Sequence, residues 1–338
     1  MGWLLIPNNR LWEYDNAPAD PGANSPYRPL WLKQTAGVRT NTDGQIVYTK
    51  VRKVGTYVDT MGEIAKTYWD VKGDDLKFQM EVLIPSGGAT FTIPCQEDGG
   101  VAFSAIIDWG DDTTNSEITT YNDGDLAHDY AAGGTYTIKI DGTFPNIHFN
   151  SAGDRLLVTK VLNLGHVGWT KLNDAFRGCA NLTEFSAGAS DTSSVTTFAH
   201  MLRLCSVLTI PEVRLDTSSA TSLAAMFYDS PITDLPGVET FDITNLSAEG
   251  ALVTFMSNGA YGLSVPSSIP TERYDAMLIA WAAQASGVAA VGNAKFGLSQ
   301  FTAGGEAQDA RTLLINTFGI DTDGDGESNS TYTDGGVA

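Results

Sequence analysis

The residues best suited to chemistry in this chain are acidic side chains that alternate near its C-terminus. Asp321, Asp323 and Asp325 precede Gly326, so their carboxylates would line one side of a loop that turns sharply at the glycine, as calcium loops do. A twelve-residue calcium loop closes with a bidentate acidic side chain at its last position, which Tyr332 occupies here. The motif therefore has two interpretations: an incomplete calcium site, or an acidic turn exposed to solvent.

No other spacing in the chain is typical of an active site. The sequence lacks a Gly-x-Ser-x-Gly elbow, a phosphate loop and a dinucleotide-binding fingerprint. Acidic pairs are frequent, so a glycosidase pair of carboxylates stays open, although most of these acids fall where turns and helix caps need them. The histidines stand in different segments without a zinc-binding spacing: His128, His148, His166 and His200. We therefore expect that the protein is not an enzyme, with calcium as the one candidate cofactor.

The charge of the chain limits its partners. It contains 40 acidic and 20 basic residues, which gives a net charge of -20. Nucleic acids and anionic membranes are bound through Lys and Arg, so we expect no nucleic acid and no membrane as partners. No apolar stretch approaches the ~20 residues of a membrane span, and residues 1–7 lack the basic start of a signal peptide. We expect a soluble chain that is not exported by the ordinary secretory route.

A repeat organises the middle of the chain. Residues 191–196 (Asp-Thr-Ser-Ser-Val-Thr) recur as residues 216–221, and a looser copy starts at Asp242, so the steps are 25 and 26 residues. A repeat of this length is typical of a leucine-rich-repeat solenoid, whose units stack because one unit alone cannot bury its apolar face. Walls of this kind mostly bind other molecules, which favours a binding or structural role.

Each repeat predicts one short helix and one short strand. Pairs of apolar residues four positions apart would share a helix face, and the Asp-Thr-Ser-Ser run would supply capping or Asx-turn oxygens. The pairs are Leu172 and Phe176, Phe198 and Leu202, Leu223 and Phe227, and Leu252 and Met256. The strands follow at Leu182-Thr183, Leu208-Thr209 and Ile232-Thr233. Cys179 and Cys205 occupy matching places, so we expect stacked, buried thiols rather than a disulfide.

Two helices and an acidic tail are predicted after the repeats, in residues 265–338, where the helices would cover the open end of a solenoid. Thr271 is placed to cap the first helix. The buried stripe of that helix would be Tyr274, Met277, Leu278 and Trp281. The second helix spans residues 306–318, with Gly319 as its C-terminal stop.

The pattern of residues 77–152 predicts a β-sandwich. Gly and Asp punctuate five strand candidates: residues 76–83, 89–94, 102–108, 135–141 and 146–150. Gly110 would permit a tight turn after a buried Trp109, and the aspartates that follow would bond amides of that turn. The rings of Tyr130 and Tyr136 would pack inside, with their hydroxyls near polar partners.

Residues 1–76 differ from the rest of the chain in their proline and tryptophan residues. Proline interrupts regular structure between residues 16 and 30, and a turn at residues 41–44 predicts a hairpin that joins residues 38–40 to residues 46–48. We interpret this segment as a β-rich or irregular arm that docks on a larger assembly through aromatic side chains. Trp3, Trp12 and Trp31 are the candidate contacts. The alternative is a small β-domain with its own Trp core.

The predicted sandwich resembles a known family. The run Ile107-Asp108-Trp109-Gly110-Asp111-Asp112, followed by His128-Asp129-Tyr130 and Gly134-Thr135-Tyr136, resembles a PKD-type immunoglobulin-like domain. The resemblance implies an immunoglobulin-like β-sandwich over residues 77–152. It also implies a structural place in a strand for His128, rather than a catalytic role.

The repeats in residues 153–264 resemble the leucine-rich repeats of BspA-like bacterial surface proteins. Met226-Phe227 matches best, Met201-Leu202 nearly matches and Ala175-Phe176 matches less well. The run from Tyr274 to Trp281, Ala310-Arg311 and Thr333-Asp334-Gly335-Gly336 resemble the end of such chains, although Met277 replaces a leucine. The resemblance implies a multidomain chain that ends in a short α/β solenoid with a helical C-terminal cap.

The combination of modules favours a non-enzymatic phage virion surface protein, because such chains resemble surface-exposed binding modules. We expect it to be assembled in the host cytoplasm as a symmetric homo-oligomer and docked on other virion proteins by its N-terminal segment. A tail fibre or receptor-binding adhesin would then present the sandwich and the repeats to a host cell-surface glycan or protein. The candidate contacts are Arg203, Leu204, Tyr228 and Asp229, which lie between the Asp and Leu-Thr steps.

Three alternatives stay open. The chain could be a capsid decoration protein, such as a head fibre or cement protein, because these also combine an N-terminal dock with outward modules. It could be a bacterial surface adhesin. It could also be an enzyme that acts on polysaccharides, but that function requires a catalytic domain for which no segment remains.

Overall fold

The computed structural model divides the chain into two compact units, Met1–Asp75 and Leu76–Ala338. This division falls one residue from the predicted end of the N-terminal segment. In the first unit the structure describes the backbone of six short strands. In the second it describes residues 76–97, 100–246, 251–256, 267–287, 294–318 and 334–338, and the backbone of residues 321–322 and 328–329.

The first unit contains a four-stranded antiparallel sheet in the order β2-β1-β3-β6. Its strands are β1 (Gly2–Ile6), β2 (Arg10–Tyr14), β3 (Leu32–Gln34) and β6 (Val51–Lys53). An antiparallel pair, β4 (Arg39–Thr40) and β5 (Ile46–Val47), confirms the predicted hairpin. The side chains of Trp3 and Trp12 and the whole of Trp31 lie outside the described residues, so the docking contacts stay a prediction.

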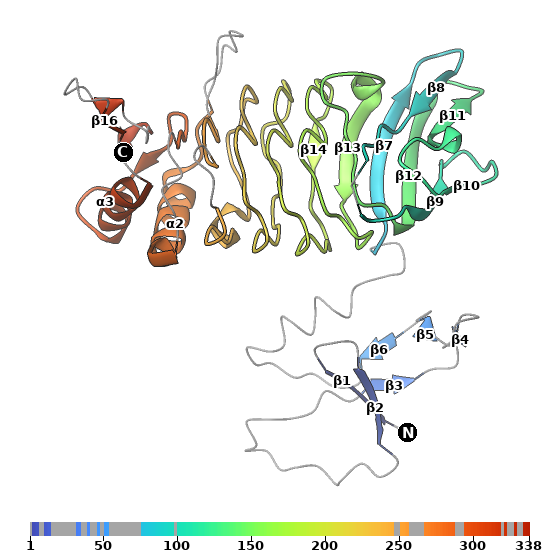
Figure 1. Cartoon of the computed structure of the whole chain (residues 1–338), viewed down its shortest axis with the longest axis horizontal. Helices are drawn as coiled ribbons and strands as arrows, with labels where there is room; N and C mark the ends of the chain where they lie inside the picture. Colours follow the sequence, from blue (N-terminus) through green and yellow to red (C-terminus); the bar gives the residue numbers. More distant parts are fainter. Residues whose placement is uncertain are drawn as a thin grey trace. The chain divides into compact units, whose positions relative to one another are not determined.

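The second unit begins with a six-stranded mixed sheet in the order β10-β9-β12-β7-β13-β14 (Figure 1). Every second residue of β7 is buried, which is the pattern of a strand with one face on a core. Strands β13 and β14 pair in parallel, and the other neighbours are antiparallel. The strands are β7 (Phe78–Ile84), β9 (Ser104–Asp108), β10 (Ser116–Ile118), β12 (Gly134–Thr143), β13 (Val158–Asn163) and β14 (Glu184–Phe185).

A two-stranded antiparallel sheet, β8 (Ala89–Thr92) and β11 (Ala127–Tyr130), completes this end of the unit. Phe91 of β8 and Tyr130 of β11 are buried in the same hydrophobic cluster as Phe78 of β7. Strands β7, β8, β9 and β12 confirm four of the five predicted strands. The fifth, at residues 146–150, was wrong, because these residues begin the coils described next: the N–H of Phe149 donates to the carbonyl of Ala175, 3.2 Å away.

Beyond the sheet, the chain winds in successive coils that stack side by side (Figure 1). Backbone N–H groups of one coil donate to carbonyls of the next: Phe176 to Met201 (2.9 Å), Leu202 to Met226 (2.9 Å) and Phe227 to Phe255 (3.0 Å). These partners lie 24 to 28 residues apart, so each coil corresponds to one copy of the sequence repeat. Hydrogen bonds of this kind satisfy the buried backbone without helices or long strands.

The short helix predicted in each repeat is a tight turn instead. In three coils an N–H donates to the carbonyl three residues earlier: Ala175 to Leu172, Met201 to Phe198 and Met226 to Leu223. The third residue of each turn is left-handed, with φ of 53° at Asp174, 59° at His200 and 50° at Ala225. A left-handed residue cannot continue an α-helix, which is why the helix prediction was wrong. The apolar pairs nevertheless reach the core, as expected.

The strands predicted at Leu182-Thr183, Leu208-Thr209 and Ile232-Thr233 are not formed at those residues. The nearest strand, β14, begins directly after Thr183. At Thr233 the coils still pair, because its N–H donates to the carbonyl of Thr209 at 2.8 Å and its Oγ1 donates to the same oxygen at 3.3 Å.

Two helices cover the far end of the stack, α2 (Thr271–Ala282) and α3 (Glu306–Phe318) (Figure 1). The four predicted residues of the α2 stripe are its buried residues. Pro270 is the N-cap of α2, and Thr271 lies inside the first turn; the capping prediction was wrong because the chain enters the helix one residue early, with Tyr274 N–H donating to the Pro270 carbonyl. Gly319 lies outside the described residues.

One hydrophobic core runs through the sheet, the coils and the helices. Trp169 packs edge-on against Phe78 (centroids 5.5 Å apart), and Phe255 packs against Trp281 of α2 (5.9 Å). Strand β13 lies in the predicted repeat region but pairs with β7 of the predicted sandwich. The C-terminal segment adds two small pairs, β15 (Gln300–Phe301) with β18 (Gly336–Val337) and β16 (Asp321–Thr322) with β17 (Ser328–Asn329). The boundaries at residues 152 and 264 stay interpretations of the sequence.

Candidate functional site

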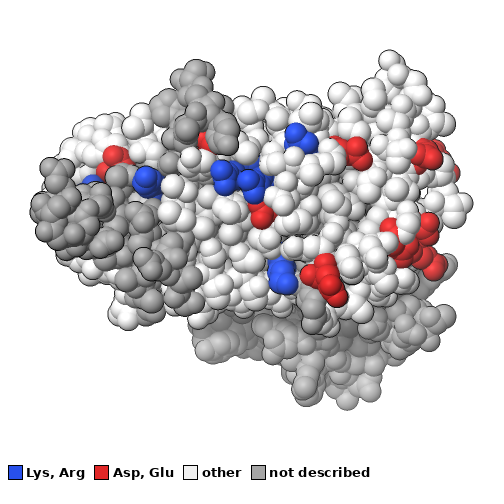
Figure 2. All heavy atoms as spheres, turned by 45° about the horizontal axis from the view of Figure 1, so that its top comes forward, with Lys and Arg blue, Asp and Glu red and all other residues white. Residues whose placement is uncertain are grey.

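Charge is unevenly distributed over the second unit. On the face shown in Figure 2, the Lys and Arg side chains lie along the stacked coils with some Asp and Glu between them, whereas only Asp and Glu are seen over the end that carries strands β8 to β12. In a chain of net charge -20, the coils are therefore the place to look for a surface that attracts a negatively charged partner.

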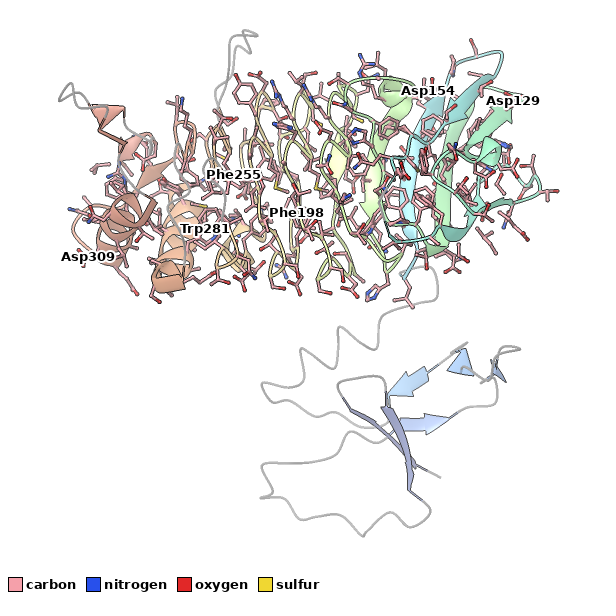
Figure 3. The ribbon with its side chains drawn as sticks, in the orientation of Figure 1. Asp129, Asp154, Phe198, Phe255, Trp281 and Asp309 are labelled. Atoms are coloured by element: carbon pink, nitrogen blue, oxygen red, sulfur yellow. The ribbon has the colours of Figure 1, made fainter. Side chains whose placement is uncertain are left out.

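One edge of the stack carries a row of polar side chains, which we call the polar edge: Asn150, Asp174, Arg177, His200, Arg203 and Tyr228. Two left-handed residues four positions apart shape this edge in each coil: Asp174 and Gly178, His200 and Leu204, and Ala225 and Asp229. The apolar residue at the start of each turn points into the stack, as Phe198 does in Figure 3. The residue before the second left-handed position is partly exposed, so Arg177, Arg203 and Tyr228 occupy equivalent places in successive coils.

Asp174 connects the first two coils of the polar edge. Its Oδ1 accepts from Arg177 Nη1 at 3.0 Å and lies 3.4 Å from His200 Nδ1. Arg177 Nη1 also donates to Asn150 Oδ1 at 3.0 Å. Burial acts to raise the pKa of Asp174, but the hydrogen bonds from His200 and Arg177 outweigh it and lower the pKa to about 2. Asp174 is therefore a structural anion with its charge already compensated.

Arg203 has different surroundings from Arg177. Its guanidinium carbon lies 4.8 Å above the ring of Tyr228, a cation–π contact. Within the described part of the chain this ring is its only side-chain partner. Its buried Nε has no hydrogen-bond acceptor, and the same holds for the Nε of Arg177. Three residues earlier, where Arg177 has Asp174, Arg203 has His200. The polar edge thus holds one guanidinium without a carboxylate.

The structure brings the four predicted contact residues together but gives them different roles. Arg203 and Tyr228 are partly exposed and in contact. Leu204 donates its N–H to the Tyr228 carbonyl at 3.0 Å and supplies a left-handed position with φ of 61°. Asp229 is 1% exposed and has φ of 56°, so it shapes the backbone and its carboxylate is not available to a surface partner.

Sequence reasoning missed the other members of the polar edge. Asn150, Asp174 and Arg177 were not among the candidates, and neither was His200, which lies in a turn with its Nδ1 3.4 Å from Asp174. The signal was present in part: Arg177 precedes Arg203 by one repeat length, as an alignment of the repeats on their apolar pairs would have shown.

The repeated aspartates have a structural role. The Oδ1 of Asp191, Asp216 and Asp242 each accepts from the backbone N–H two residues later (2.9–3.2 Å) and from that residue's hydroxyl (2.6–2.7 Å). This confirms the predicted Asx turns. The hydrogen bonds from Ser193 lower the pKa of Asp191 despite partial burial. Acids held in this way are poor candidates for catalysis.

The Trp-Gly-Asp turn is also satisfied internally. The indole of Trp109 stacks on His128 with centroids 4.8 Å apart, and His128 Nε2 lies 2.8 Å from Asp111 Oδ2. Tyr130 donates its hydroxyl to the Trp109 carbonyl at 2.9 Å. At Gly110, φ is 77° and a Cβ would meet the Thr137 carbonyl oxygen at 2.5 Å, so only glycine fits. These contacts confirm the predicted packing, and they engage the Nε2 of His128.

The two repeat cysteines are buried free thiols, as predicted. The Sγ of Cys205 donates to the carbonyl of Phe176 at 3.3 Å. Burial raises the pKa of both thiols well above the ordinary range, so neither is a nucleophile.

The calcium candidates Asp321, Asp323 and Asp325 have side chains outside the described residues, and the metal site stays a prediction. Asp334 is the acid nearest to that motif in the described tail. Its side chain is 1% exposed and is bound by Arg311 (2.6 and 3.0 Å) and by the Tyr274 hydroxyl (2.9 Å). The residues that the structure describes contain no group of three His, Cys, Asp or Glu side chains arranged to hold a metal ion.

No helix in the described ranges has both the length and the apolar composition needed to cross a lipid bilayer. Comparisons with known proteins returned no match, whether with protein-family models, with curated proteins or with solved structures.

Proposed function

We propose that the second unit joins a PKD-type immunoglobulin-like sandwich to a short leucine-rich-repeat solenoid with a helical cap. The two facing sheets and the buried Trp109 support the first assignment. The coil-to-coil hydrogen bonds at the spacing of the sequence repeat support the second.

On this fold we propose a non-enzymatic surface protein of a phage virion, with a tail fibre or receptor-binding role. The observation that carries the proposal is the polar edge: side chains from consecutive coils are held in one row by backbone bonds between the coils. A row of fixed polar side chains on a rigid wall suits recognition of an extended ligand, because little conformational entropy is lost on binding.

The N-terminal unit would provide the attachment to the particle. Its short strands and Trp-rich sequence support a docking role, since aromatic residues are enriched where protein interfaces form. The sheet and coils of the second unit would then face outward to a host-surface glycan or protein.

Immunogold electron microscopy of purified phage particles, with antibody against the coils, tests this proposal. Label at the tail tip is expected. Label over the capsid would instead favour decoration of the head. Label on bacterial cells but not on particles would overturn the virion assignment and favour a bacterial adhesin. Antibody against residues 1–75 is the internal control, because a docked N-terminal unit should be labelled less on particles than in the free protein.

Binding and hydrolysis must be separated in a second experiment. The purified chain should bind host-surface glycans and leave their chain length unchanged after long incubation. Shortened glycan chains would overturn the non-enzymatic assignment.

A further inference from the structure

We propose that Arg203 and Tyr228 form a binding subsite for the carboxylate of an acidic polysaccharide, such as one built from uronic acids. The inference rests on the proposed binding function of the polar edge and names the chemistry of its ligand. It follows from a comparison of equivalent positions within the molecule.

The two arginines of the polar edge differ in their partners. Arg177 has Asp174 three residues before it and donates to that carboxylate at 3.0 Å. Arg203 has His200 at the same place, and His200 itself turns toward Asp174. Since the backbone of the two coils is equivalent, the missing carboxylate of Arg203 is a difference in sequence and not in fold. A ligand carboxylate would supply the partner that the neighbouring coil supplies internally.

The surrounding charges favour an anion at this place. Arg177 and Arg203 lie one coil apart, and Arg155 lies against Gly178 beside Arg177. The partly buried carboxylate of the edge, Asp174, is already paired with Arg177 and lies 3.4 Å from His200 Nδ1. Asp229 adds a negative charge below the surface, where it is 1% exposed. The edge is therefore locally cationic within a chain of net charge -20, which leaves this patch attractive to acids while most of the chain repels them.

The Tyr228 ring prepares Arg203 for this role. A guanidinium 4.8 Å above an aromatic ring keeps a fixed plane, and a planar fork of N–H groups matches a carboxylate with two parallel hydrogen bonds. Because Arg203 is held before the ligand arrives, less rotamer entropy is lost on binding. A repeating acidic polymer fits the row better than a single small anion, since further groups can contact Arg177 and Asn150.

The test is calorimetric titration of the full chain with an alginate hexasaccharide, which carries a carboxylate on every sugar, at low salt. Arg203→Gln should weaken binding by about tenfold or more, and Arg203→Lys should weaken it less, because it keeps the charge and loses the fork. Tyr228→Phe should bind like the parent chain, and Tyr228→Ala should bind more weakly. The matched control is Arg214→Gln, which removes the same charge from an exposed arginine paired with Glu212.

Equal affinity of the parent chain and Arg203→Gln would overturn the proposal, as would equal losses in Arg203→Gln and Arg214→Gln, which indicate general charge attraction. If the chain does not bind the hexasaccharide, or binds neutral maltohexaose equally well, a carboxylate is not the group that the site recognises. Competition by inorganic phosphate stronger than by acetate would reassign the site to phosphate. The titrations and the immunogold experiment test different proposals. If the titrations contradict the carboxylate site, the virion location still depends on the immunogold result. If only bacteria are labelled, the virion assignment is overturned but the carboxylate site is not affected.

Discussion

The aspartate turns and the polar edge lie on the same coils but treat their polar residues in opposite ways. At the turns, Asp191, Asp216 and Asp242 make the same pair of hydrogen bonds in three successive coils. At the polar edge, equivalent places hold Arg177, Arg203 and Tyr228, and each has different partners.

The side of the stack that carries the aspartate turns, which we call the constant side, also has side-chain hydrogen bonds from one coil to the next. The buried Thr192 donates its hydroxyl to the carbonyl of Asp216 at 3.0 Å, and Thr217 donates to that of Asp242 at 2.9 Å. Where the series ends, Ile243 replaces the threonine and its N–H donates to Gln284 at the end of α2. Residues that repeat with fixed contacts hold the stack together, whereas residues that differ on a fixed backbone are available for recognition.

The largest expected effect is in the core that both sides share. Phe198→Ala should lower the free energy of unfolding by about 3–5 kcal/mol, because it removes a fully buried ring and leaves a cavity. Urea unfolding followed by circular dichroism measures the change. Val207→Ala, on the same coil but 47% exposed, should change it by less than about 0.5 kcal/mol. Similar losses in the two variants would contradict the assigned core.

Thr217→Val tests the constant side directly. The substitution keeps the shape and removes the hydroxyl that bonds the next coil, so it should lower the free energy of unfolding by about 1–3 kcal/mol. Ser219→Ala, two residues later and partly exposed, is the control and should be nearly neutral. A neutral Thr217→Val would show that the repeated threonine does not join the coils.

The pH dependence of unfolding tests the contribution of Asp174 to stability. Its folded pKa of about 2 lies below the ordinary value of about 3.9, so the unfolded chain binds more protons in this range. The stabilisation by Asp174 is therefore complete above pH of about 3.9 and is lost as the pH falls toward 2. Asp174→Asn should flatten the acid limb of the stability curve in that window. Asp309→Asn, on an exposed position of α3, should leave the limb closer to that of the parent chain.

The smallest expected effect on stability is at the proposed subsite. Arg203→Gln should change the free energy of unfolding by less than about 1 kcal/mol, since it removes a partly exposed cation–π contact. Compared with Thr217→Val, Arg203→Gln should lower the free energy of unfolding in urea by less and should lower the affinity for the glycan by more. The reverse order would abolish the distinction between a structural and a recognition side.

Local patterns predicted the elements whose formation depends on nearby residues. The alternation of β7, the apolar stripe of α2 and the hairpin of β4 and β5 are each contained within a short window of sequence. The repeat helices were mispredicted because apolar pairs four apart fit both a helix and a tight turn that faces a core. The left-handed residues Asp174 and His200, which decide between the two, have no glycine to reveal them.

The candidate site was predicted in part for the same reason. The position of Arg203 and Tyr228 between the repeat landmarks indicated that both lie on the variable face, whereas their mutual contact is seen only in the structure. The burial of Asp229 could not be inferred, because an aspartate after an exposed tyrosine is usually solvated.

The sequence by itself determined the repeat length, the Asx turns and the apolar residues that enter the core, because all three follow from the types and spacing of residues along the chain. Only the tertiary structure decided which carboxylate meets which arginine. Asp174 contacts Arg177 within its own coil and His200 in the next, and that choice depends on the stacking of coils a full repeat apart. The same stacking leaves Arg203 beside an aromatic ring rather than an acid.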